Sequence, residues 1–137
     1  MNIAIVYDSR TGTTAKAAEA MSAKLTERGH TCTVKSISQA DPAEIANADL
    51  VCVGSWVEGL FIVMQHPTAG VMQFMERLGS LSGKKAVVFC TYKLATGSTL
   101  SKMAKALEAK GAAVVGQFKY RGSEPDAAFA AFADSLK

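Results

Sequence analysis

Short apolar segments alternate with helix-like segments along the whole chain, and this alternation limits the fold more than any other feature of the sequence. The apolar segments are rich in Val and Ile, as are strands that are buried on both faces of a sheet. We expect strands at residues 3–7, 31–37, 50–54, 84–91 and 113–120. Strict alternation predicts an α/β fold with a parallel sheet and helices on both faces, because crossovers between parallel strands are right-handed.

Helical spacing and helix-boundary residues mark most of the segments between the strands. Asp41 and Pro42 are typical of an N-cap and a first helical position, and Gly29 is typical of a residue just past a helix end. Thr99 is interpreted as another N-cap. Helices are expected at residues 13–28, 42–47, 68–78, 99–110 and 125–136, while residues 55–67 form a long segment without an assigned element.

Five strands in a chain of 137 residues suit one doubly wound domain that covers residues 1–137, with sheet order 2-1-3-4-5. The second strand alternates polar Thr31, Thr33 and Lys35 with less polar residues, so we expect it at a sheet edge, where this order places it. In such a sheet, ligands bind beyond the carboxyl ends of the strands, between the first and third strands.

The segment after the first strand contains four hydroxyl side chains and one glycine within six residues, and it leads directly into a helix. A helix N-terminus offers unpaired N–H groups and a positive dipole end, which together hold a phosphate. The alternative is a simple helix cap, for which one hydroxyl would suffice. Neither a Walker sequence nor a GxGxxG sequence is present, so a mononucleotide phosphate is the better expectation. The residues concerned are Ser9, Thr11, Gly12, Thr13 and Thr14.

The hexapeptide Ser9-Arg10-Thr11-Gly12-Thr13-Thr14 resembles the phosphate-loop signature of flavodoxins, [ST]-x-T-G-x-T, at every defining position. The order of elements is also similar to that of short-chain flavodoxins over nearly the whole chain, without an insertion in the last strand. The resemblance implies a flavodoxin-like fold, FMN as cofactor, and phosphate binding by this loop, Arg10 included.

In flavodoxins, the loops after the third and fourth of these strands hold the flavin ring. The resemblance implies that Ser55, Trp56 and Val57 contribute to the first loop, with Trp56 stacked on the ring; plain packing of the loop is the alternative. Gly59 would let the backbone face the ring. In the second loop, Thr91, Thr96 and Gly97 would supply hydrogen bonds and Tyr92 a second aromatic ring. The chain lacks the Gly-Asp pair and the later Tyr that many flavodoxins have there.

The chain is basic, with a net charge of +3, whereas ordinary flavodoxins are acidic. Arg10 and Lys93 are expected near the site, with Glu58 on another side. An acidic redox partner would therefore suit this protein better than a basic one. Lys and Arg are scattered along the chain, so nucleic acid is not indicated.

Two redox functions are weighed. The first, which we favour, is an electron carrier between redox partners. The second is an FMN-dependent reductase or oxidase that acts on a small apolar substrate such as a quinone or tetrapyrrole, with the apolar segment 60–64 as a substrate wall and His66 as a candidate proton donor. The alternatives for these residues are packing under the loop and a solvated histidine.

A third hypothesis is a flavin-free binding domain of the same topology. A phospho-receiver domain needs an acidic pair after the first strand and an Asp at the end of the third. Here Asp8 is the single acidic residue after the first strand, and Gly54-Ser55 ends the third. The sequence therefore does not indicate a phospho-receiver domain.

The cysteines and the N-terminus indicate the compartment. Cys32, Cys52 and Cys90 lie in strand-like apolar segments without a CxxC pair, so we interpret them as buried small residues rather than disulfide partners or metal ligands. The first residues are typical of a strand rather than a targeting segment, and no apolar run reaches the roughly 18 residues of a membrane span. We expect a cytoplasmic protein.

Overall fold

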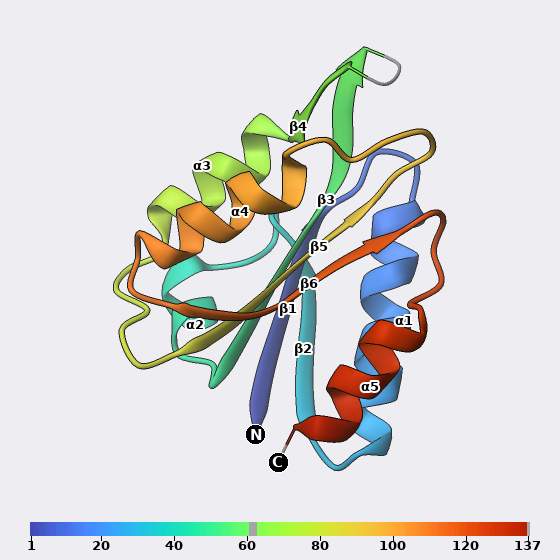
Figure 1. Ribbon diagram of the computed structural model, residues 1–137. Helices are drawn as coiled ribbons and strands as arrows, with labels where there is room; N and C mark the ends of the chain where they lie inside the picture. The colour runs from blue at the N-terminus through green and yellow to red at the C-terminus, as the bar shows by residue number, and fades with distance from the viewer. Residues whose placement is uncertain (61–62, 137) are drawn as a thin grey trace.

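The structure is a computed structural model that describes residues 1–60 and 63–136, without the side-chain surroundings of residues 59–64 (Figure 1). The strands are β1 (Asn2–Asp8), β2 (Thr31–Ser36), β3 (Leu50–Leu60), β4 (Val63–Pro67), β5 (Lys85–Thr91) and β6 (Ala113–Tyr120). The helices are α1 (Thr13–Glu27), α2 (Pro42–Ala46), α3 (Ala69–Arg77), α4 (Thr99–Glu108) and α5 (Ala127–Ser135).

Five strands form a parallel sheet in the order β2-β1-β3-β5-β6. The predicted order 2-1-3-4-5 numbered five strands; because the structure has the additional strand β4, the fourth and fifth predicted strands are β5 and β6. The parallel pairing ends where Asp8 lies opposite Ser55, and Trp56 opposite Thr91. The carboxyl ends of β1, β3 and β5 therefore lie side by side at one end of the sheet.

No element was predicted for residues 55–67, and the structure has two antiparallel strand segments there. β3 continues past the parallel sheet as far as Leu60, and β4 pairs with it antiparallel, with Val57 opposite Pro67 and Glu58 opposite His66. The predicted strand 50–54 covers only the part of β3 that is buried between β1 and β5. Ser55 and Trp56 still pair within the parallel sheet, and the part of β3 from Val57 onward pairs with β4 and stands out beyond the sheet (Figure 1).

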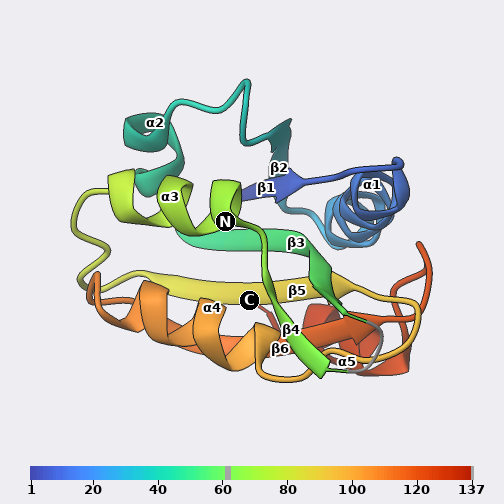
Figure 2. The same cartoon turned by 90° about the horizontal axis from the view of Figure 1, so that it is seen from above.

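Alternate residues of the strands supply two hydrophobic cores, one on each face of the sheet. Val6, Val53 and Val88 point to the face covered by α3 and α4, whereas Ile5 and Phe89 point to the face covered by α1 and α5. Figure 2 shows α3 and α4 on one side of the strands and α1 and α5 on the other. Burial on both faces explains why these strands have continuous apolar sequences.

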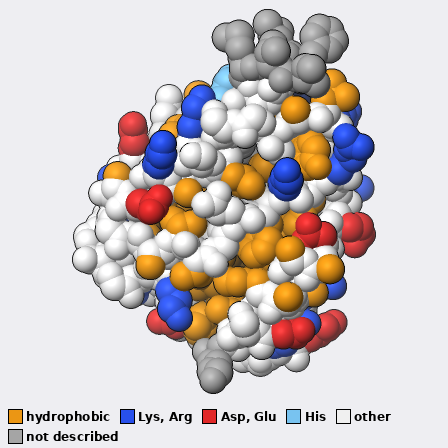
Figure 3. All heavy atoms as spheres, viewed as in Figure 1, with side chains coloured by type: hydrophobic (Ala, Val, Ile, Leu, Met, Phe, Trp, Pro, Cys, Tyr) orange, Lys and Arg blue, Asp and Glu red, His pale blue; other side chains and the backbone are white. Residues whose placement is uncertain are grey.

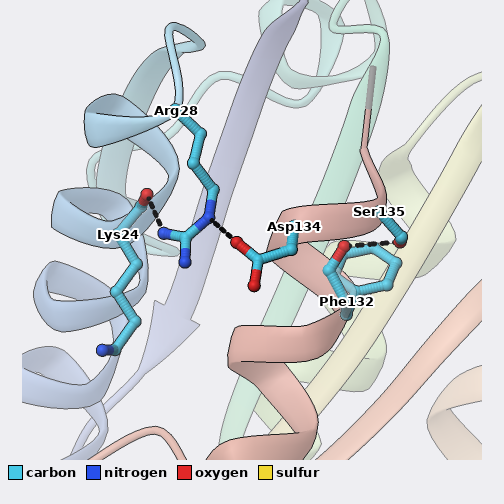
Figure 4. Close-up of polar contacts among 5 residues, drawn as sticks. All are labelled: Lys24, Arg28, Phe132, Asp134 and Ser135. Carbon is cyan, nitrogen blue, oxygen red and sulfur yellow. Dashed lines mark hydrogen bonds and ion pairs between the residues drawn. The ribbon is translucent and has the colours of Figure 1, made fainter.

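The last helix closes the second core and is tied to α1. Phe129 of α5 is fully buried against Phe118 of β6, and their rings meet edge-on with centroids 5.4 Å apart. Arg28 Nε donates to Asp134 Oδ1 at 2.6 Å, and the same guanidinium donates to the Lys24 carbonyl (Figure 4). Because Asp134 is mostly exposed, this ion pair adds little beyond the apolar packing.

Most helix boundaries follow the predicted signals. Asp41 is the N-cap of α2 and accepts from the Ala43 N–H at 3.0 Å, and Gly29, with φ of 90°, follows the end of α1. The prediction of Thr99 as an N-cap is wrong by one residue. Ser98 is the N-cap, and Thr99 is the first residue of α4, where its side chain is buried and unavailable as a cap.

Gly54 lies very close to the side chain of Phe89 on the neighbouring strand. A Cβ at Gly54 would lie 2.1 Å from the Phe89 ring on the neighbouring strand. The ring thus occupies the space above the last core position of β3, just before the strand reaches the residues described next.

Candidate cofactor site

A cavity of about 750 Å³ lies at the carboxyl ends of β1, β3 and β5. This volume falls within the roughly 300–1,000 Å³ typical of small-molecule sites. The position is the one that a doubly wound sheet reserves for a ligand. The lining residues are Ser9, Arg10, Thr11, Thr13, Thr14, Trp56, Val57, Gln65, Thr91, Tyr92, Lys93, Leu94, Ala95, Arg121 and Gly122.

The loop between β1 and α1 forms one wall of the cavity and has the features of a phosphate site. Gly12 is the N-cap of α1, has φ of 92°, and provides no side-chain cap. Within the described residues, no backbone N–H of residues 13–15 donates to a protein acceptor, and the first turn holds no acidic residue. These free donors and the helix dipole favour an anion. A simple helix cap, the alternative considered above, does not describe this N-terminus.

Hydroxyl groups shape the loop without adding charge. The Gly12 N–H donates to Ser9 Oγ at 3.1 Å, which leaves the Ser9 proton free to donate elsewhere. Thr11 and Thr13 hydroxyls lie 3.4 Å apart. Thr14 is buried, and its hydroxyl bonds to the Thr91 hydroxyl at 2.7 Å, so that the start of α1 is fixed to the end of β5.

Two aromatic residues line the cavity, and each has an arginine above its ring. Trp56 lies in β3 opposite Thr91, the last residue of β5, and Tyr92 directly follows Thr91. The Arg10 guanidinium lies 5.4 Å from the centre of the Trp56 ring, and the Arg121 guanidinium lies 5.8 Å from that of Tyr92. Both distances are within the range of cation–π attraction. A flat aromatic ligand could stack against either ring.

A partly buried hydrogen-bond network connects the backbone of Trp56 to Asp8 and to the start of α3. Thr68 Oγ1 donates to Asp8 Oδ2 at 2.6 Å, and the Thr68 N–H donates to Ser55 Oγ at 3.0 Å. Ser55 Oγ in turn donates to the Trp56 carbonyl at 2.6 Å. Asp8 is therefore paired with the start of α3, although it immediately precedes the phosphate-type loop.

The structure brings most of the predicted site residues together. Nine of them line the cavity: Ser9, Arg10, Thr11, Thr13, Thr14, Trp56, Val57, Thr91 and Tyr92. Gly12 shapes the loop through its backbone, and Ser55, which is fully buried, contacts Trp56 rather than the cavity. Thr96 and Gly97 are not among the lining residues; Gly97 instead lies against Gln65 of β4. The surroundings of Gly59 and of the predicted apolar wall 60–64 lie outside the described residues.

Sequence reasoning missed part of the cavity. Arg121 and Gly122 follow the last strand, to which no function was assigned, and Leu94 and Ala95 lie in the loop after β5. Arg121 and Gly122 could have been predicted from the sheet order, since β6 ends at the same edge of the sheet as β5. His66 does not line the cavity, and its Nδ1 lies 2.7 Å from the carbonyl oxygen of Pro67.

The charge of the cavity wall is of one sign. Arg10, Lys93 and Arg121 are exposed cations, and no Asp or Glu occurs among the described lining residues. In Figure 3, Lys and Arg side chains lie on both the left and the right of the upper half of the face. The cavity mouth is therefore positive.

All three cysteines are free; Cys52 and Cys90 are buried as predicted, whereas Cys32, on the edge strand β2, is only partly buried. Cys52 and Cys90 are fully buried; burial raises the pKa of Cys90 to about 12, although nearby Lys119 lowers it, and burial also raises the pKa of Cys52. Both thiols are thus protonated at neutral pH. Across the described residues, no cluster of His, Cys, Asp and Glu has the arrangement of a metal site.

The fold and the cavity define a doubly wound α/β protein with a phosphate-type loop of the mononucleotide kind and two aromatic residues beside it. The sequence model of the flavodoxin family matches residues 5–133, and the chain therefore belongs to the flavodoxin family. No curated protein sequence matches this chain.

Solved structures with a similar fold include flavodoxins and a longer oxidoreductase chain. Two-electron reduced Megasphaera elsdenii flavodoxin is 22% identical with a TM-score of 0.80, covering 98% of this chain and 99% of that one. A short-chain flavodoxin associated with a non-canonical PDU bacterial microcompartment is 21% identical with a TM-score of 0.81, covering 99% and 96%. Rubredoxin:oxygen oxidoreductase of Desulfovibrio gigas is 19% identical with a TM-score of 0.77, covering 98% of this chain but 33% of that one.

Membership of this family makes the protein an FMN-binding electron-transfer flavoprotein. When bound, FMN supplies the electron-accepting and electron-donating ring, and the chain supplies its orientation and surroundings. The residues present fit this cofactor, because free N–H donors for a phosphate and aromatic side chains for a ring line the same cavity. In the described part of the chain, no helix has the length and apolar character needed to span a membrane.

Proposed function

We propose that this protein carries electrons between redox partner proteins on an FMN held in the cavity at the carboxyl ends of β1, β3 and β5. One observation carries the proposal: the uncapped N-terminus of α1 and the aromatic side chains of Trp56 and Tyr92 line a single cavity. An anion site and two aromatic surfaces so close together suit a molecule with a phosphate at one end and a flat ring at the other.

Each wall has a separate task in this proposal. The loop 9–14 holds the phosphate through backbone N–H groups and through the hydroxyls of Ser9, Thr11 and Thr13. Trp56 and Tyr92 orient the ring by stacking and exclude water from it. Thr14 and Thr91 keep the two walls at a fixed separation, since their hydroxyls bond to each other. Val57 adds an apolar contact beside Trp56.

We further propose that the protein partner is acidic at its docking face. The cavity mouth carries Arg10, Lys93 and Arg121 without a compensating carboxylate among its described lining residues. Opposite charge raises the rate of encounter, and like charge lowers it. The three free cysteines suit the reducing cytoplasm, where we place the protein.

The test is a titration of the cofactor-free protein with FMN, followed by visible absorption and by the fluorescence of Trp56, the single tryptophan. We expect uptake of FMN with quenched emission. The double variant Thr11→Val/Thr13→Val weakens binding by about a hundredfold or more, since each lost hydrogen bond to a charged group contributes roughly 1.5–3 kcal/mol.

Thr33→Val, on the exposed face of the edge strand β2, serves as the matched control and leaves affinity unchanged. A folded protein that takes up no FMN contradicts the proposal. Rapid turnover of a small quinone, with slow transfer to any protein, would instead favour the enzyme that acts on an apolar substrate.

A further inference from the structure

Leu94 is an apolar side chain left in solvent at the mouth of the cavity. It is 57% exposed, and with Val115 it is one of two large hydrophobic residues that the structure exposes among its described residues. It lies between β5 and α4, in the loop that follows Tyr92, and belongs to neither hydrophobic core. Packing of this domain therefore does not account for a leucine at this position.

Three cationic side chains line the same cavity as Leu94. Lys93 precedes it in the loop, Arg121 lies over the neighbouring Tyr92 ring, and Arg10 lies over Trp56 on the opposite wall. All three cations are exposed, and none takes part in an ion pair within the described part of the chain. Their charge is therefore available to a second molecule.

An exposed apolar side chain with charged neighbours is a common composition for a protein docking surface. The apolar group supplies burial at the centre of the interface, where few residues contribute most of the affinity. The charges around it speed encounter and determine which partners are accepted.

We propose that Leu94 is the apolar anchor of a docking surface made with Lys93, Arg121 and Arg10, and that its partner is an electron-transfer protein with an apolar depression ringed by carboxylates. This inference rests on the proposed function, because the docking surface surrounds the mouth of the proposed cofactor cavity. It adds the residue that fixes the partner in place and the shape that the partner must offer.

The test measures electron transfer into the FMN-loaded protein from a reduced, acidic [2Fe–2S] ferredoxin, by stopped-flow absorption at saturating FMN. The iron–sulfur cluster loses one electron, and the cofactor of this protein gains it. For the wild-type protein, we expect the second-order rate constant to fall severalfold between 20 and 300 mM salt (general test conditions at roughly one-seventh and twice physiological ionic strength).

Two pairs of variants separate the anchor from the charges. Leu94→Ser should lower the rate constant by about three- to tenfold at both salt concentrations, whereas Val115→Ser, at the other exposed apolar residue, should not. Lys93→Glu should lower the rate constant mainly at low salt. Lys85→Glu, an exposed lysine at the opposite end of β5, is its control.

A parallel reaction with a small neutral oxidant distinguishes docking from damage to the cofactor site. Because Leu94 also lines the cavity, the comparison is between the two reactions: docking predicts that Leu94→Ser slows electron transfer from the ferredoxin several times more than it slows the reaction of the reduced protein with benzoquinone. The inference is overturned if Leu94→Ser slows both reactions alike, if Val115→Ser has the same effect, or if rates with the ferredoxin rise with salt. Failure of FMN to bind at all would count against the proposed function and would be seen before any of these rates.

Discussion

Two arginine side chains set the charge around the aromatic residues of the cavity. Arg10 and Arg121 come from loops after different strands, and each lies over one ring. Because both are exposed, their attraction to the rings is modest. Their greater effect is electrostatic, since a positive charge near a redox ring favours the state that carries more electrons.

The corresponding prediction is that Arg10→Gln and Arg121→Gln each lower the reduction potential of the bound FMN by about 20–50 mV, allowing for solvent screening. Removing a positive charge makes the electron-rich state less stable, so reduction becomes harder. Potentiometric titration measures the shift. Lysine at either position should restore most of the potential, and Arg77→Gln, on the last turn of α3, should not change it. Equal potentials in all these variants would contradict the electrostatic effect.

Cys90 gives a prediction on pH. Burial raises the pKa of the folded thiol from 9.0 to about 12, so the folded state keeps its proton while the unfolded state loses it above pH 9. Stability is therefore intact below pH 9 and is lost as pH rises toward 12, at up to roughly 1.4 kcal/mol per pH unit. We expect Cys90→Ala to have a shallower loss than wild type in urea unfolding between pH 8.5 and 10. Parallel curves for the two proteins would show that Cys90 does not titrate in this way.

At the scale of the elements, sequence reasoning predicted the sheet well and the hairpin not at all. Strands buried on both faces have continuous apolar sequences, so β1, β3 and β5 were readable. β2 was placed at the edge by its alternation, and the structure confirms it. The β3–β4 hairpin was missed because its pairing is between two parts of one segment, which no alternation of strand and helix indicates.

The residues of the cavity were likewise predictable only where a short segment of sequence carries the pattern. The loop 9–14 was predicted from a local pattern of hydroxyls around Gly12, and it lines the cavity. Arg121 and Leu94 depend on where separate loops meet, and the shared role of Ser55 and Thr68 depends on a contact across thirteen residues. Such contacts are properties of the folded chain, whereas a loop signature is a property of a short peptide.

Thr68 joins three elements, and its replacement tests that junction. Its hydroxyl caps α3 by accepting from the Val71 N–H and donates to Asp8 on β1. Thr68→Val should lower the free energy of unfolding by roughly 2–4 kcal/mol, since it removes both a cap and a bond to a carboxylate. Thr68→Ser keeps the hydroxyl and should cost about 1 kcal/mol or less. Urea unfolding measures both, and a similar loss in the two variants would mean that the methyl group, not the hydroxyl, is responsible.

At the scale of the whole molecule, the proposed cofactor would connect parts of the chain that are otherwise joined mainly through the sheet. The cavity lies between the start of α1, the hairpin, and the loops after β5 and β6. A ligand that binds this folded arrangement and not the unfolded chain must stabilise it by mass action. The size of the effect depends on which walls the ligand contacts.

Comparison of FMN with riboflavin therefore tests both walls in one experiment. FMN at 100 times its dissociation constant should raise the free energy of unfolding by about 2.7 kcal/mol. Riboflavin at the same concentration has the ring without the phosphate, so it should stabilise less, because the N–H donors at the start of α1 stay unused. Inorganic phosphate should stabilise weakly and should compete with FMN but not with riboflavin. Equal stabilisation by FMN and riboflavin would mean that the loop 9–14 does not hold the phosphate, and that the ring contacts at Trp56 and Tyr92 supply the affinity.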